Sequence, residues 1–124
     1  MLLDYDDSYD PPAPVVPLRI ADPDGAAGVL TTGLIDTGAD CTVVSAVLAA
    51  ALRLPKVDEL EITGVGGGGG IVPVHAARVE LAGAELVARV VAFGSEVIIG
   101  RDLLNRIVAL LDGPKLKLRL SAGR

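Results

Sequence analysis

The chain has 124 residues, 51% of them hydrophobic, and a formal net charge of −5. This length suits one domain, and the hydrophobic fraction is large enough to fill its core. Only 2% of the residues are aromatic, so the sequence lacks the stacking platform that binds single-stranded nucleic acid, and we expect no nucleic acid partner.

The acidic excess lies at the start of the chain. Six Asp residues and one base, Arg19, occur within residues 1–24. Residues 1–17 combine acid, Pro and Tyr without helical or strand periodicity, which predicts a flexible acidic tail ahead of one domain over residues 18–124. No secretory signal is visible and the apolar runs are too short to span a bilayer. We therefore expect a cytoplasmic protein without a membrane partner.

Strands dominate the predicted elements. PLRI and GVLTTGLI flank the turn sequence DPDG at 22–25, which predicts a hairpin, and SAVLAAALRL predicts a short helix over 45–54. The segments LEITGV, IVPVHAARVEL, ELVARVVAF and VIIG are typical of strands, RDLLNRI of a second short helix, and VALLDGPKLKLRL of two strands whose last shows one basic face. About eight strands and two short helices, mostly in meander order, predict an all-β fold, either a closed β-barrel or an orthogonally packed one.

Cysteine and histidine chemistry is sparse. Cys41 is the only cysteine and His75 the only histidine, which excludes an internal disulfide framework and argues against a zinc site or a Ser-His-Asp triad. For both residues we favour a structural role, Cys41 as a small buried hydrophobe and His75 as a strand residue, over a nucleophile and its base. No metal and no cofactor are expected.

The glycine run GVGGGGG at 64–70 matches the dinucleotide-binding spacing through Gly64, Gly66 and Gly69. That fingerprint needs a helix directly after the loop, and the following IVPVHAARVEL contains a proline and β-type residues instead. Nucleotide binding is therefore disfavoured. A glycine tip between two strands predicts a mobile hairpin, which is either a lid or an idle loop.

An apolar run ends on a carboxylate in LIDTGADCTV at 34–43. A charge at the end of a buried strand is costly unless it has a partner, and two carboxylates in contact lower that cost by sharing one proton. Such a pair can deprotonate a water and protonate a peptide carbonyl, which is general acid/base hydrolysis. Because Asp36 lies in the only Asp-Thr-Gly of the chain, the second carboxylate must come from another copy, which predicts a two-fold homodimer.

Three motifs carry a resemblance to a known family. Asp36-Thr37-Gly38-Ala39-Asp40, the glycine-rich hairpin, and Ile98-Ile99-Gly100-Arg101-Asp102-Leu103-Leu104 resemble the retropepsin-like (retroviral-type) aspartic proteases, and the basic last strand is closer to the cellular and bacterial single-domain members. The resemblance implies a closed β-barrel of the acid-protease type, with one lobe per chain. Family flaps commonly carry a bulky side chain at the tip, and this chain has none between Val65 and Ile71.

The resemblance also implies roles for individual residues. Asp36, Thr37 and Gly38 would be catalytic, and an Asp40–Arg101 ion pair would tie the active-site turn to the second helix; Arg suits such bidentate contact with a carboxylate. Substrate-binding positions would be Ala39, Asp40, Val65, Gly66, Gly67, Gly68, Gly69, Gly70 and Ile71.

Two functions remain open at this level. The first is a homodimeric aspartic endopeptidase that acts on a peptide or unfolded protein substrate, with a preference for apolar residues around the cut. The alternative is a dimerising or peptide-binding module that keeps the retropepsin-like shape and cleaves little. Cleavage that depends on Asp36 separates the two.

Overall fold

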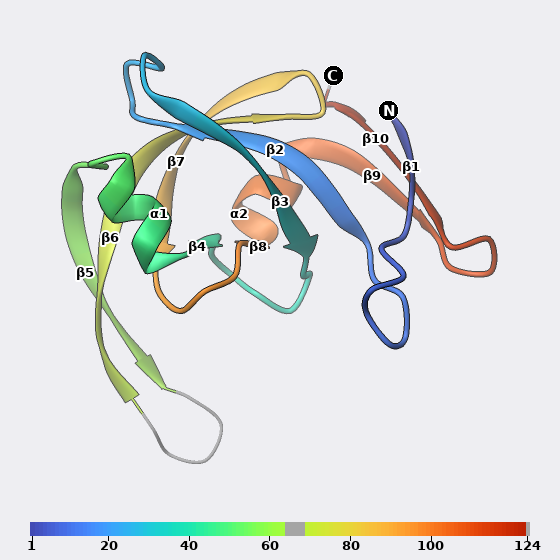
Figure 1. Cartoon of the computed structure of the whole chain (residues 1–124), viewed down its shortest axis with the longest axis horizontal. Coiled ribbons are helices and arrows are strands. Elements are labelled where there is room, and N and C mark those ends of the chain that lie inside the picture. Colours follow the sequence, from blue (N-terminus) through green and yellow to red (C-terminus); the bar gives the residue numbers. More distant parts are fainter. Residues whose placement is uncertain (64–68, 124) are drawn as a thin grey trace.

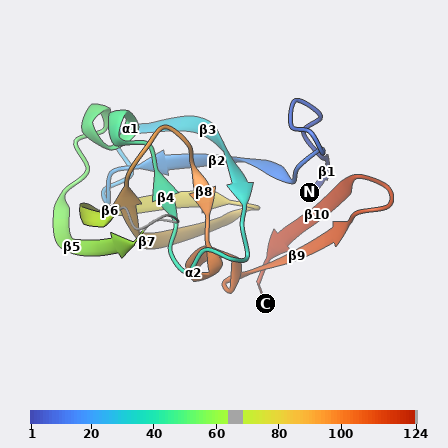
Figure 2. The same cartoon turned by 90° about the horizontal axis from the view of Figure 1, so that it is seen from below.

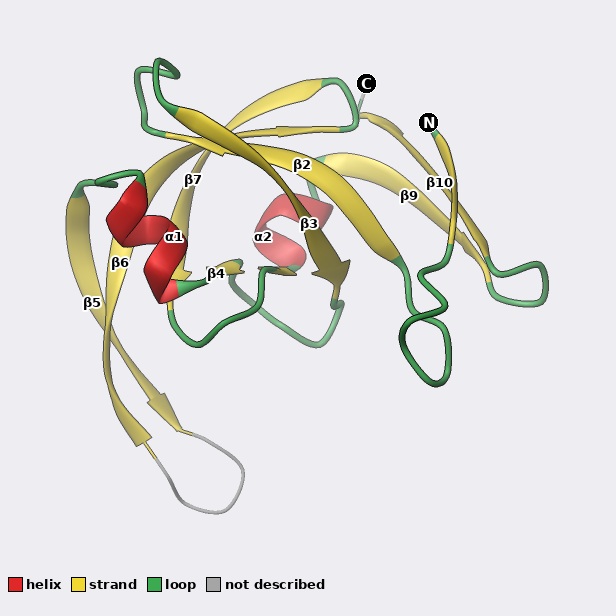
Figure 3. Cartoon of the chain, in the orientation of Figure 1, coloured by secondary structure: helices red, strands yellow, loops and turns green. Residues whose placement is uncertain are grey.

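The computed structural model describes residues 1–63 and 69–123. These residues form ten strands and two short helices (Figures 1 and 3). The elements in chain order are β1 (Leu2–Asp4), β2 (Val15–Ala21), β3 (Gly28–Ile35), β4 (Val43–Val44), α1 (Ala46–Ala51), β5 (Lys56–Thr63), β6 (Gly69–Leu81), β7 (Ala84–Ala92), β8 (Ile98–Ile99), α2 (Arg101–Leu104), β9 (Ile107–Asp112) and β10 (Lys117–Ala122).

The larger sheet closes on itself. Its seven strands run in the order β2-β3-β8-β4-β7-β6-β5, and β2 also pairs with β6, so six of them form a ring of neighbours. This agrees with the predicted all-β fold of the barrel type. The expected meander order fails around β4 and β8, because β8 lies between β3 and β4, β4 neighbours β7 instead of β5, and the pairs β3–β8 and β4–β7 are parallel. Short apolar strands such as VIIG carry no pattern that selects their neighbours.

Alternation along the strands builds the core. In β2, Val16, Leu18 and Ile20 are buried while Pro17 is exposed, and β6 and β7 alternate in the same way over most of their length. One face of each strand therefore turns inward, as the period of two requires. The largest fully buried apolar side chains are Ile20, Leu81, Ile99, Leu103, Leu118, Leu120, Val16, Val44, Val79 and Val90.

The two helices occur where the sequence predicted them. Ser45 is the N-cap of α1, and its Oγ accepts a 3.1 Å hydrogen bond from the backbone N–H of Leu48. The second helix, α2, begins at Arg101, directly after Gly100. In the part of the chain that the structure describes, no helix has the length and apolar character needed to cross a bilayer.

The start of the chain corrects the predicted flexible tail. Leu2–Asp4 pairs antiparallel with β10, and the α-amino group of Met1 donates a 2.9 Å hydrogen bond to the carbonyl of Leu120. A second sheet of order β1-β10-β9 results, which we call the terminal sheet (Figure 2). The physical reason lies in β10, which is paired with β9 on one side and offers β1 an open edge on the other. Residues 15–17 likewise belong to β2 rather than to a tail.

Candidate active site

Strand β3 delivers Asp36 to a tight turn. The Asp36 N–H donates to the carbonyl of Ile99 at 3.0 Å, which anchors the end of β3 to β8. One carboxylate oxygen of Asp36, Oδ1, accepts a 2.9 Å hydrogen bond from the N–H of Gly38. Ile35 is buried, Asp36 is half-buried and Gly38 is exposed, so the single chain leaves the carboxylate more open to water than the sequence suggested. The second oxygen remains available to a ligand or a partner.

Arg101, the first residue of α2, holds the Asp36 turn through two hydrogen bonds. Its backbone N–H donates to the carbonyl of Ala39 at 2.9 Å, and its Nη1 donates to the carbonyl of Thr37 at 2.7 Å. These two bonds span the residues directly after Asp36. The segment that begins α2 therefore fixes the backbone of the Asp36 turn.

A buried network continues this attachment. Thr42 is only 1% exposed, and its hydroxyl donates to Oδ1 of Asp102 at 2.7 Å and accepts from the N–H of Gly100 at 3.1 Å. The N–H of Thr42 donates to Oδ2 of Asp102 at 3.1 Å. All the polar atoms of the buried threonine side chain are thus satisfied, as stability requires.

The predicted Asp40–Arg101 ion pair is wrong for this chain. Among the described residues, Arg101 forms no ion pair, and its guanidinium bonds a backbone carbonyl instead. The carboxylate that links the turn to α2 is that of Asp102. Thr42 and Asp102 were not predicted as site residues, although Thr42 lies beside the Asp36 motif and Asp102 within the motif at 98–104. A threonine directly before the apolar pair Val43-Val44 was the available signal, since a buried hydroxyl needs partners.

An apolar hollow lies on β4 and β8, which pair with each other beside β3. Its volume is about 280 Å³, and its lining includes Val43, Phe93 and Ile98, with Ser95 and Glu96 at its polar side. Ile98 pairs with Leu34 of β3 and with Val43 of β4, so the hollow lies on strands that neighbour β3, the strand that ends directly before Asp36. Figure 2 shows β4, β8 and the end of β3 close together above α2.

Comparison with known proteins agrees with this arrangement. Residues 26–106 match the family model described as "gag-polyprotein putative aspartyl protease". The chain belongs to this aspartyl protease family. The match includes the Asp36 turn, the glycine run and the start of α2.

Two solved structures share the fold. EIAV protease complexed with the inhibitor HBY-793 is 26% identical, with 75% of this chain and 86% of that chain covered and a TM-score of 0.50. The solution structure of simian foamy virus (mac) protease is 16% identical, covers 70% of this chain and 89% of that chain, and also has a TM-score of 0.50. No curated protein matches the chain significantly. These findings confirm the retropepsin-like resemblance.

In this aspartyl protease chain the predicted flap is the β5–β6 hairpin. Val72, Val74 and Val91 form a small buried cluster, against which Cys41, Val43 and Ile62 pack. The cluster joins the underside of the hairpin to the segment that follows the Asp36 turn. Figure 1 shows the hairpin extending well away from the closed sheet.

The predicted flap tip is only partly described. Val65, Gly66, Gly67 and Gly68 lie outside the described residues. Gly69 and Gly70 begin β6 and pair with Thr63 and Ile62, while the side chain of Ile71 is 70% exposed. Gly69, Gly70 and Ile71 therefore belong to the hairpin, whose neighbouring positions Ile62 and Val72 turn inward to the cluster.

The surroundings of Cys41 and His75 argue against a nucleophile and its base. Nδ1 of His75 lies 2.7 Å from the carbonyl oxygen of Leu54, to which it donates when protonated there. Burial raises the pKa of the Cys41 thiol above its ordinary value, and the negative charges of Asp40 and Asp102 raise it further. A raised pKa disfavours the thiolate that nucleophilic catalysis needs. Among the described residues, no group of three or more His, Cys, Asp or Glu side chains is arranged to hold a metal ion.

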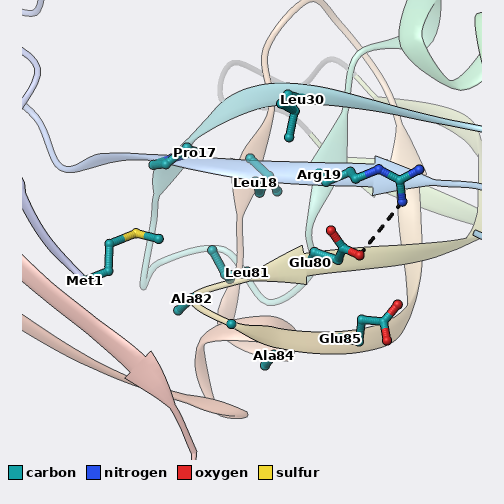
Figure 4. A pocket seen from close by; sticks show the side chains of 11 residues that line it. Met1, Pro17, Leu18, Arg19, Leu30, Glu80, Leu81, Ala82, Ala84 and Glu85 are labelled. Atoms are coloured by element: carbon teal, nitrogen blue, oxygen red, sulfur yellow. Dashed lines mark ion pairs between the residues drawn. The ribbon is translucent and has the colours of Figure 1, made fainter.

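A larger hollow lies elsewhere on the aspartyl protease domain. Its volume is about 430 Å³, and Figure 4 shows Leu18, Leu30 and Leu81 around it, with an ion pair between Arg19 and Glu80 at 4.0 Å. Its lining contains no residue of the Asp36 turn, and its β6 residues Glu80 and Leu81 lie beyond the part of β6 that pairs with β5. We therefore centre the candidate active site on Asp36.

Proposed function

We propose that the protein is a homodimeric aspartic endopeptidase in which the Asp36 carboxylates of two protomers activate one water. The observation that carries the proposal is the state of Asp36 in the single chain. Its carboxylate accepts a hydrogen bond through Oδ1, is half-buried, and follows strand β3, whose neighbour β8 helps to line an apolar hollow. Membership of the aspartyl protease family supports the proposal. The chain has one Asp-Thr-Gly, so a second protomer supplies the other acid.

The reaction follows from one proton shared by the two carboxylates. The ionised carboxylate takes a proton from the water while the water oxygen bonds to the scissile carbonyl carbon, and the protonated carboxyl gives its proton to the carbonyl oxygen. The tetrahedral diol then collapses: the carbon–nitrogen bond breaks, the nitrogen gains a proton from one carboxyl, and a diol hydroxyl returns a proton to the other. The Gly38 N–H holds Oδ1 of Asp36 throughout, which leaves Oδ2 to face the water.

The substrate we propose is an extended peptide or an unfolded protein. The hollow lined by Val43, Phe93 and Ile98 accepts an apolar side chain next to the cut. A peptide between this hollow and the β5–β6 hairpin gains main-chain hydrogen bonds as an added strand. We propose that the β5–β6 hairpin closes over it as a flap and excludes bulk water.

The test is cleavage of an unfolded, apolar protein across pH 3 to 8, followed by mass spectrometry. Wild type is compared with Asp36→Asn and with Asp24→Asn, a control that alters an exposed carboxylate in the β2–β3 turn. We expect wild type and Asp24→Asn to cleave on the carboxyl side or amino side of apolar residues, with inhibition by a statine-type mimic, and Asp36→Asn to be inactive. The rate should be bell-shaped in pH, because the mechanism needs one carboxylate ionised and one protonated.

Two results would overturn the proposal. One is equal cleavage by wild type and Asp36→Asn, which would place the chemistry elsewhere or in a contaminant. The other is peptide binding without cleavage by a folded, dimeric wild type at every pH. That second result would identify the chain as a peptide-binding module with the retropepsin-like shape.

A further inference from the structure

Glu96 brings a charge to the apolar hollow on β4 and β8. Of the described residues that line this hollow, Val43, Phe93 and Ile98 provide apolar walls, and Glu96 alone is charged. Glu96 is exposed, and its carboxylate forms no ion pair within the described part of the chain. The hollow therefore combines an apolar surface with a carboxylate that has no cation beside it.

Backbone hydrogen bonds hold the segment that carries Glu96. The N–H of Phe93 donates to the carbonyl of the last residue of β4 at 3.0 Å, and the carbonyl of Gly94 accepts from the first residue of α1 at 3.1 Å. On the other side of Glu96, the carbonyl of Val97 accepts from β3 at 3.0 Å. Gly94 has a φ of +65°, a left-handed conformation that suits glycine. The carboxylate is therefore presented from a backbone that is held on both sides, which lowers the cost of ordering it around a ligand.

No positive side chain competes for this position. Glu96 also lines a second hollow of about 280 Å³, whose described lining includes Tyr9 and Thr31. Neither hollow has an arginine, a lysine or the histidine among the described residues that line it. A cation that approaches this face therefore meets one carboxylate and no like charge among the described lining residues.

The hollow on β4 and β8 suits one long side chain. Its volume of about 280 Å³ lies below the roughly 300–1,000 Å³ of sites that hold a drug-sized ligand. Lysine and arginine lay an apolar stem along an apolar surface and keep the charged end in a polar place. Here the stem would contact Val43 and Ile98, and the charged end would reach Glu96. The ring of Phe93, which is 52% exposed, offers the cation a further favourable face.

We propose that Glu96 selects substrates with lysine or arginine next to the cleaved bond. The inference rests on the proposed function, which places the substrate in this hollow. Neutral apolar side chains enter the same hollow but gain no attraction from Glu96. A two-fold dimer repeats the hollow on the other side of the Asp36 pair, so the preference applies to both sides of the cut. The substrate class is an unfolded segment with a basic residue on each side of the cleaved bond.

Peptide binding tests this selection apart from catalysis. The protein is Asp36→Asn, so that bound peptide stays intact, and the readout is fluorescence anisotropy at pH 6. Two labelled peptides differ only in their central pair, Lys-Lys or norleucine-norleucine, between Ala-Val and Val-Ala. Norleucine keeps the four-carbon stem and lacks the charge. Because each exposed charge pair contributes about three- to fivefold, we expect the lysine peptide to bind about tenfold more tightly. Added salt should reduce this ratio.

A second substitution identifies the carboxylate responsible. Adding Glu96→Gln to Asp36→Asn should bring the ratio of the two affinities close to one. Adding Glu85→Gln is the matched control, since this exposed carboxylate of β7 lies outside both hollows, and it should leave the ratio unchanged. Equal affinities for the two peptides, a ratio that Glu96→Gln does not alter, or no binding of either peptide would overturn the inference.

Cleavage of the same peptides separates this inference from the proposed function. With wild type we expect kcat/KM to be at least about fivefold higher for the lysine peptide, and Glu96→Gln to remove the difference. Equal cleavage of both peptides that depends on Asp36 would refute the role of Glu96 and leave the endopeptidase intact. Binding of the lysine peptide that depends on Glu96, without cleavage by wild type at any pH from 3 to 8, would support the selection and refute the endopeptidase.

Discussion

The hydroxyl of Thr42 donates a 2.7 Å hydrogen bond to Oδ1 of Asp102, which joins residues that lie 60 positions apart in the chain. The bond connects the segment after the Asp36 turn to the first turn of α2. Because the same hydroxyl also accepts from the Gly100 N–H, one buried atom holds two backbone segments together. This relationship makes the threonine a sensitive position.

Thr42→Val should lower the free energy of unfolding by about 1–3 kcal/mol. Valine has nearly the same shape, but it leaves the buried Gly100 N–H without its partner and removes one of the two hydrogen bonds that Oδ1 of Asp102 accepts. The measurement is urea denaturation, with Thr32→Val, at an exposed position of β3, as the control. A loss no greater than that of the control would show that the hydroxyl contributes nothing net.

Gly100→Ala should destabilise the protein by about 1–3 kcal/mol or more. A Cβ at this position would lie 2.5 Å from the carbonyl oxygen of Cys41 and 3.1 Å from that of Ala39, and both obstacles are backbone. Gly113→Ala is the matched control, because a Cβ there meets nothing within 4 Å. The control should be neutral or stabilised by up to about 1 kcal/mol. Similar denaturation midpoints for the two variants would contradict the close approach at Gly100.

Arg101→Met should reduce activity much more than stability. The side chain is exposed, so its loss should cost less than about 1 kcal/mol, but it removes the 2.7 Å bond to the Thr37 carbonyl beside Asp36. A small displacement of a catalytic group lowers the rate by about 10- to 100-fold. The readouts are kcat and the urea midpoint, compared with Arg89→Met on β7. An unchanged kcat would exclude a positioning role.

The raised pKa of Cys41 predicts slow alkylation and a loss of stability at alkaline pH. The thiol should react with iodoacetamide at pH 8 more slowly than an unstructured cysteine, and Asp40→Asn should speed the reaction because it removes a charge that raises the pKa. The folded state keeps the proton above pH 9.0, the ordinary thiol value, while the unfolded state loses it. The stabilisation is therefore fully present below this pH and declines as pH rises through the folded pKa.

Unfolding of wild type and Cys41→Ala between pH 7 and 10.5 measures this decline. The free energy of unfolding should fall more steeply with pH in wild type than in Cys41→Ala. Parallel curves, together with ordinary alkylation rates, would show that the thiol is not perturbed by its surroundings.

Local chemistry made much of this fold predictable. The turn at 22–25, the Ser45 cap and the alternation of Leu118 and Leu120 with basic residues all depend on neighbours in the sequence, and the structure contains each of them. The position of β8 was not predictable, because a two-residue apolar strand fits beside many others.

The candidate site was likewise predictable only in part. The apolar segment that precedes Asp36 made this residue predictable. Which carboxylate links the Asp36 turn to α2, that of Asp40 or that of Asp102, depends on how α2 packs against β4. That geometry arises from packing between segments far apart in the chain. The general preference of Arg for carboxylates could not decide how Asp40, Arg101 and Asp102 are paired.

The terminal sheet has a mechanical consequence. Leu2 pairs with Arg119 in an antiparallel ladder whose first bonds join Met1 and Leu120, so the two ends of the described chain lie side by side (Figure 1). A force applied between these ends would break the hydrogen bonds of the ladder one after another, instead of loading all of them in shear at the same time. We expect β1 and β10 to separate at low force while the closed ring of six strands stays intact.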